Sequence, residues 1–405
     1  MKWIVRFVVG ALVGVMVVAG CGLFSPEGFP RALTEEESKL VNEDYAFGFK
    51  LFREIVATAE DTANIFISPL SVAMALGMTY NGARGETQEA MQATLELSEM
   101  SLQEVNESYC SLIDLLREAD SKVDFRIANS IWYRDDFTVK DEFIDLSETY
   151  FDAVVRALDF DDPASVDVIN DWVKENTNGK IEEIIDGIGP LTVMYLIDAI
   201  YFKGIWEYEF PEDSTRADSF QLADGSFVPC EMMRLTDSLS YFENELFQAV
   251  DLSYGNGCYG MVVILPWEGV DLDSLIEGMD QAVWDEWMAG FSEDEVVLEM
   301  PKFTLEYGLT LNDVLTALGM GIAFDEERAD FSGISEEQVW IDSVLHKTFV
   351  QVDEEGTEAA GVAVVVLERE VLRMRVDRPF MFVIWERNSG VILFMGRLTR
   401  PVWGE

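Results

Sequence analysis

Apolar side chains recur at helical spacing in the first third of the chain, whereas runs of Val, Ile, Tyr and Phe dominate the rest. The spacing from Leu40 to Ala59 predicts an amphipathic helix. A short strand-like run then meets Ser68 and Pro69, which are typical of a helix N-cap and first helical position. The helix that follows is apolar on all sides from 72 to 79, so we expect it to be buried. The order of elements favours an α+β fold, because no βαβ alternation is present.

The segment from Val352 to Pro379 has two halves with different physical character. Three successive carboxylates at 353–355 favour a solvated surface, and Gly356 then supplies a permissive backbone joint. From Thr357 to Val366 every residue except Glu358 is small or β-branched, which suits a strand. One alternating face would be Thr357, Ala359, Gly361, Ala363, Val365 and Leu367, and the other Glu358, Ala360, Val362, Val364, Val366 and Glu368. The pattern alone leaves two readings open, a buried strand or an exposed loop.

The amino-acid composition argues against a disordered chain and against a nucleic-acid-binding protein. The 405 residues are 49% hydrophobic with 26 Phe and 10 Trp, enough to fill a large core, and this is not a disordered composition. The formal net charge of −48 argues against nucleic acid as a partner, because the phosphate backbone would be repelled. Such a surface favours a soluble monomer.

Residues 1–21 are predicted to be a targeting segment. Lys2 and Arg6 precede an apolar run from Phe7 to Val18, which is shorter than a membrane span. Val18-Ala19-Gly20-Cys21 resembles a bacterial lipoprotein cleavage box, which would leave Cys21 for lipid attachment. The alternative is an ordinary secretory signal with a coincidental cysteine. We therefore expect a signal peptide at 1–20, a lipid-anchored tether at 21–36, a folded domain at 37–405, and an exported protein held at a membrane outside the cytoplasm.

The cysteines and the single histidine exclude several chemistries. Cysteines stand at 21, 110, 230 and 258, with no C-x-x-C spacing, so no zinc, metal or other cofactor is expected. A Cys230–Cys258 disulfide and free thiols both remain open. His346 is the only histidine, which disfavours His-dependent hydrolases and zinc enzymes.

Several blocks along the chain resemble the serpin family. The turn and hinge E-E-G-T-E-A-A-G at 354–361 resembles the family's reactive-loop hinge. N-I-F-I-S-P-L-S at 64–71 with N-G-A-R-G-E-T at 81–87, the I-N-D-W-V block at 169–173 and A-I-Y-F-K-G-I-W at 199–206 follow in family order. So do M-V-V-I-L-P at 261–266, M-P-K-F at 300–303, D-F-S-G-I at 330–334, R-P-F at 378–380 and F-M-G-R at 394–397. The resemblance covers nearly everything after the tether.

The resemblance implies a fold of three β-sheets with eight to nine helices and an exposed reactive loop, and it implies no enzyme activity. It also implies a suicide substrate: a target protease cleaves the loop, and the freed loop inserts into the main sheet and traps the protease covalently. The expected partner is a serine protease or, as a second option, a cysteine protease. A non-inhibitory serpin acting as a surface binding protein or chaperone is the alternative. The small residues at Thr357 and 359–363 favour inhibition, because non-inhibitory members tend to carry bulky, charged or proline residues there.

The resemblance also assigns roles to residues. The hinge is Glu354, Glu355, Gly356, Thr357, Glu358, Ala359, Ala360 and Gly361. Counting from Gly356 places the reactive bond at Glu370–Val371, with Leu367, Glu368 and Arg369 as alternatives. Ser68, Ser71, Asp198 and His346 form the shutter, where the main sheet parts to admit the loop, and Trp206 belongs to the breach.

Asp198 departs from the family, which usually has asparagine there. We expect an ion pair between Asp198 and His346, because a lone buried carboxylate would otherwise be unpaired. Such a pair would raise the pKa of His346 and latch the closed sheet.

Overall fold

The computed structural model describes residues 30–355 and 371–403. In these residues there are nine α-helices and fourteen strands, so the expected α+β fold is confirmed. The helices are α1 (Glu35–Thr58), α2 (Pro69–Tyr80), α3 (Gly85–Thr94), α4 (Leu102–Glu118), α5 (Asp141–Phe151), α6 (Ala164–Asn176), α7 (Leu272–Glu277), α8 (Gln281–Gly290) and α9 (Asn312–Leu315).

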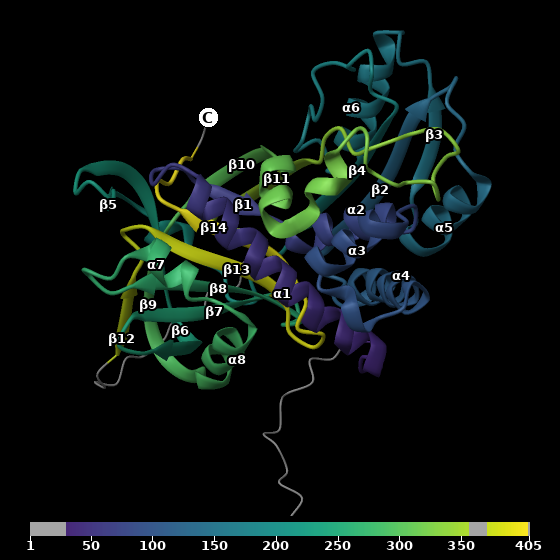
Figure 1. The fold of residues 1–405 in the computed structure, drawn as a ribbon. Helices are drawn as coiled ribbons and strands as arrows, with labels where there is room; N and C mark the ends of the chain where they lie inside the picture. Colours follow the sequence, from purple (N-terminus) through teal and green to yellow (C-terminus); the bar gives the residue numbers. More distant parts are fainter. Residues whose placement is uncertain (1–29, 356–370, 404–405) are drawn as a thin grey trace, which may run out of the picture.

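The strands form three sheets, as expected (Figure 1). The first seven strands are β1 (Ile65–Ile67), β2 (Asp124–Arg134), β3 (Val154–Leu158), β4 (Met194–Lys203), β5 (Arg216–Gln221), β6 (Phe227–Glu243) and β7 (Phe247–Tyr254). The others are β8 (Tyr259–Pro266), β9 (Ser292–Pro301), β10 (Phe303–Thr310), β11 (Leu345–Val352), β12 (Leu372–Arg375), β13 (Phe380–Glu386) and β14 (Ile392–Leu398). A nine-stranded sheet runs in the order β1-β14-β13-β8-β7-β6-β9-β12, with β5 paired to β6. Separate sheets contain β3-β2-β4 and β10-β11.

Local signals explain where the first helices begin. Thr34 caps α1 and forms a capping box with Glu37, whose carboxylate accepts the Thr34 N–H. Arg31 reaches back to Glu37 at 2.7 Å, so chain that we expected to be tether is already tied to the fold before residue 37. Ser68 caps α2 by accepting the Ser71 N–H, and Pro69 occupies the first helical position, as the sequence predicts.

The core explains how α2 reaches the functional region. Buried side chains cover nearly all of α2, because it lies against α1, α4, β4 and β14. Each fully buried Leu, Val or Met contributes about 1.5–3 kcal/mol of transfer free energy. A second apolar cluster, built around Trp132, Ile169 and Val173, fixes α6 on the sheet of β2, β3 and β4. The helices therefore hold β4 firmly from both sides.

Two further observations concern the described residues only. No helix among them is long and apolar enough to cross a membrane. Cys110, Cys230 and Cys258 are free thiols, which settles the question that the sequence left open. The proposed targeting segment and Cys21 lie outside the described residues.

Candidate functional site

Two strands from different sheets lie side by side without pairing. β4 bonds to β2 on one side, and β11 bonds to β10 on one side, so each has an edge with no backbone partner among the described residues. The ends of both strands line one cleft, which includes Phe202 and Val350. The start of β4 and the chain just before β11 line another, which includes Met194 and Ser343. The two strands therefore run parallel with facing edges that do not pair with each other, and the space between these edges is called the gap below.

The cleft at the carboxyl ends of the two strands is the wider one. It measures about 290 Å³ and is lined by polar and aromatic residues, among them Lys180, Tyr201 and Gln351. Trp206 forms one wall and stacks on Tyr254 with ring centroids 4.2 Å apart. Its indole N–H donates to the Asp353 carbonyl at 2.9 Å. Trp206 thus holds the chain where it leaves β11, and its assignment to the breach stays a prediction.

A buried ion pair sits next to Trp206. Glu354 accepts a hydrogen bond from Lys302 at 2.6 Å and another from the Thr215 hydroxyl at 2.6 Å. Burial alone would raise the pKa of Glu354, but the hydrogen bonds from Lys302 and Thr215 hold it below its ordinary value. On its other side the Lys302 ammonium lies 4.2 Å from the ring centroid of Trp403. The first hinge residue is therefore anchored, and Glu355 follows it at the surface.

The amino end of α2 contacts both β4 and β11. The Ser68 N–H donates to His346 Nε2 on β11 at 3.0 Å. The Ser71 hydroxyl donates to Asp198 Oδ1 on β4. The structure thus brings all four predicted shutter residues to one place, where one helix terminus bridges two strands that do not bond to each other.

The predicted ion pair between His346 and Asp198 is wrong. These residues are both described, and no salt bridge joins them. Burial lowers the pKa of His346 to about 4, so its ring is neutral and Nε2 is free to accept the backbone N–H. Burial likewise raises the pKa of Asp198 to about 7, which the Ser71 hydroxyl only partly opposes, and Oδ2 has no hydrogen-bond partner among the described residues. Each strand therefore has its own polar contact with α2, because the two side chains turn to the helix terminus rather than to each other.

Most of the remaining predicted site residues fall in the part of the chain that is not described. Gly356, Thr357, Glu358, Ala359, Ala360 and Gly361 of the hinge, and Leu367, Glu368, Arg369 and Glu370 at the expected cleavage site, lie outside the described residues. Val371 is half-buried and directly precedes β12. The sequence analysis assigned no role to Thr215, Tyr254 or Trp403, and none to Lys302 although it stands in the M-P-K-F block. A lysine directly after a buried strand, in a chain with only 28 Lys and Arg, was the one available signal.

The described residues offer no site for metal chemistry. No group of three or more His, Cys, Asp or Glu among them is arranged to hold an ion. What the arrangement can do is structural: two facing strand edges can accept a further strand, with backbone hydrogen bonds on both sides.

Comparison with known proteins gives the same picture. The family described as Serpin (serine protease inhibitor) matches residues 42–401. An uncharacterized serpin-like protein of Thermococcus kodakarensis is 35% identical over 376 residues, which is 90% of this chain and 87% of that protein. The native state of the thermophilic serpin tengpin superposes with a TM-score of 0.83 at 32% identity, covering 91% of this chain and 95% of the other. The mouse protein-Z dependent protease inhibitor superposes with a TM-score of 0.82 at 26% identity, covering 91% and 100%. With its three sheets, its split pair of parallel strands and this match over most of its length, the chain belongs to the serpin family.

Proposed function

We propose that this protein inhibits serine proteases as a suicide substrate, by inserting its cleaved loop between β4 and β11. The proposal rests on the gap, whose two edges have no backbone partner in the part of the chain that the structure describes and whose wide end lies where the chain leaves β11. Most serpins are protease inhibitors rather than enzymes, and one of the similar structures is itself described as a protease inhibitor.

The chemistry of the trap needs no catalytic residue from this chain. The protease serine attacks the carbonyl carbon of Glu370, the Glu370–Val371 peptide bond breaks, and the Val371 amine leaves with a proton. The product is an ester between the serine oxygen and Glu370. Insertion of the freed chain then carries the ester-linked protease away from its starting position before water can release it.

The dimensions support insertion. Thr357 to Glu370 is fourteen residues, which extend over about 46 Å at ~3.3 Å per residue. The ten residues of β4 extend over about 33 Å, so the segment is long enough to line the whole gap. About one net hydrogen bond per inserted residue, each contributing ~1 kcal/mol, yields on the order of 10 kcal/mol. That is comparable to the stability of a protease domain.

The decisive experiment is a search for a covalent complex. The purified protein would be incubated with serine proteases of glutamyl, trypsin-like, chymotrypsin-like and elastase-like specificity, and with a cysteine protease. We expect at least one serine protease to form a complex that survives SDS and whose mass is the sum of protease and loop-cleaved inhibitor. Cleavage of the loop by every protease without any such complex would favour the non-inhibitory alternative and contradict the proposal.

The cellular location of the protein is part of the same proposal. We propose that it is exported and held at the membrane by a lipid on Cys21, on the strength of the Val18–Cys21 sequence. Expression of the full chain and of Cys21→Ala in a bacterium would test this. We expect wild type in the membrane fraction and Cys21→Ala in the soluble exported fraction; equal partitioning of the two would contradict the anchor.

A further inference from the structure

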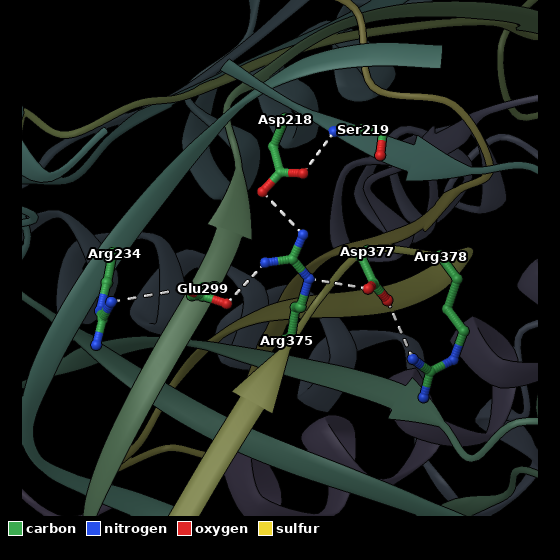
Figure 2. A network of polar contacts seen from close by, with 7 residues as sticks. All are labelled: Asp218, Ser219, Arg234, Glu299, Arg375, Asp377 and Arg378. Carbon is green, nitrogen blue, oxygen red and sulfur yellow. Dashed lines mark hydrogen bonds and ion pairs between the residues drawn. The ribbon is translucent and has the colours of Figure 1, made fainter. Parts of the chain in front are cut away.

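Arg375, the last residue of β12, binds three carboxylates from three parts of the chain. Its guanidinium contacts Asp218 Oδ2 of β5 at 2.8 Å, Glu299 Oε2 of β9 at 2.9 Å and Asp377 Oδ2 at 3.0 Å. Figure 2 shows the guanidinium at the centre of these three groups. One side chain therefore joins β12 to two other strands and to the chain that follows it.

The network around Arg375 is balanced in charge. Arg234 lies 4.0 Å from Glu299, and Arg378 lies 3.2 Å from Asp377, so three guanidinium groups face three carboxylates (Figure 2). The hydrogen bond to Asp218 and those to Glu299 and Asp377 raise the pKa of Arg375 further, although partial burial opposes them. The pKa of Asp218 is lowered chiefly by Arg375. In a chain with 76 acidic and 28 basic residues, this is a concentrated use of arginine.

The backbone alone holds β12 weakly. β12 is four residues long, and among the described strands it pairs with β9 alone, in parallel, at the edge of the nine-stranded sheet. Beyond the strand, the Val376 N–H donates to the Glu299 carbonyl at 2.8 Å. Met374 and Val376 are fully buried and add apolar contact. A short parallel edge strand has few hydrogen bonds to lose, so ion pairs form a large part of its attachment.

The position of β12 in the chain gives this attachment a mechanical role. Fifteen residues, 356–370, join the end of the gap to Val371 and β12. After cleavage at Glu370–Val371 the segment can enter the gap while β12 stays on β9. In an uncleaved molecule, full insertion would place residue 370 about 46 Å along the gap, and Val371 would have to follow. An intact loop therefore cannot insert fully unless β12 detaches from β9.

We propose that Arg375 is a positioning residue that locks β12 onto β9 and so restricts loop insertion to cleaved molecules. The inference rests on the proposed insertion mechanism. It predicts that loss of the Arg375 network speeds the spontaneous, inactivating insertion of the uncleaved loop and leaves insertion after cleavage unchanged.

The test compares Arg375→Met with Arg373→Met and wild type. Arg373 lies on the same strand and is exposed, and no described carboxylate lies within ion-pair distance of it, so both variants make the same change of charge and side chain. Each protein would be incubated uncleaved, and the fraction converted to a more heat-stable form would be followed by thermal unfolding, with mass spectrometry to show that the chain is intact. In parallel, each protein would be cleaved in the loop and its gain in Tm measured.

We expect Arg375→Met to convert at least about fivefold faster than wild type, since several part-exposed ion pairs are lost together. Arg373→Met should convert at the wild-type rate, and all three cleaved proteins should gain the same Tm. Arg375→Lys should lie between, because an ammonium cannot bind three carboxylates in one plane; it also serves as the test variant if Arg375→Met does not fold. Equal conversion rates for the Arg375 and Arg373 variants would overturn the inference while leaving the proposed function intact. No gain in Tm on cleavage of wild type would instead overturn the proposed function.

Discussion

The Lys302 ammonium lies 2.6 Å from the Glu354 carboxylate at the point where the described chain leaves β11. Both side chains are close to buried, at 13% and 9% exposed. Removal of the cation leaves a desolvated carboxylate whose remaining side-chain partner among the described residues is the Thr215 hydroxyl. We therefore expect Lys302→Met to lower the free energy of unfolding by roughly 2–4 kcal/mol.

Urea unfolding of the native protein would measure this loss. The matched control is Lys174→Met, which removes the exposed pair with Glu182, and should cost less than about 1 kcal/mol. If both lysine variants lose the same small amount, the Lys302–Glu354 pair does not stabilise the start of the hinge.

The pH dependence of stability should carry a signature of Asp198. Its folded pKa of about 7 lies above the unfolded value, so the folded state binds more protons between pH 4 and 7. The Asp198 contribution is therefore fully present below pH 4 and is lost as pH rises through 7, with a slope of at most about 1.4 kcal/mol per pH unit.

Asp198→Asn keeps the shape and the acceptor for Ser71 but cannot ionise. We expect it to equal wild type near pH 4 and to exceed it increasingly up to pH 8, as measured by urea unfolding across this range. The buried Asp44 of α1, whose pKa burial also raises to about 7, is present in both proteins and cancels in the difference. A difference between the two proteins that does not vary with pH would show that Asp198 is ionised throughout.

An arginine at position 357 should separate cleavage from trapping. The first small face of the inserting segment begins at Thr357, and a long cation there would be desolvated as insertion starts. We expect Thr357→Arg to be cleaved at the wild-type bond but to form far less SDS-stable complex with the same protease. Glu358→Arg, on the alternate face, is the control and should still trap. Equal trapping by the two variants would argue against insertion through this segment.

The cleavage site can be read from the released carboxy-terminal peptide. We expect a mass that begins at Val371, which corresponds to a protease that accepts glutamate. Cleavage after Arg369 would indicate a trypsin-like target, and cleavage after Val366 or Leu367 an enzyme with an apolar pocket. A peptide that begins outside 367–372 would refute the assignment of the reactive bond.

The local features of the site could be predicted from the sequence, whereas the features that depend on tertiary structure could not. Ser68 and Pro69 indicate where α2 begins, because helix capping depends on residues that are close together in the sequence. Nothing local in β4 or β11 shows that the two strands lie together unpaired, since this depends on how three sheets close around the helices. Likewise, proximity of His346 and Asp198 could be inferred, but the direction of each side chain could not. The Ser68 N–H and the Ser71 hydroxyl decide that direction.

The unpaired edges of β4 and β11 also bear on self-association. An open pair of strand edges is a template for any extended chain, including the loop of a second molecule. Linkage of that kind would propagate from one copy to the next and form filaments. With a net charge of −48, copies of this protein repel one another at low salt, which slows such encounters. The acidic surface thus opposes polymer formation. This repulsion between copies weakens as salt screens the charge or as pH falls towards the pI of about 4.1.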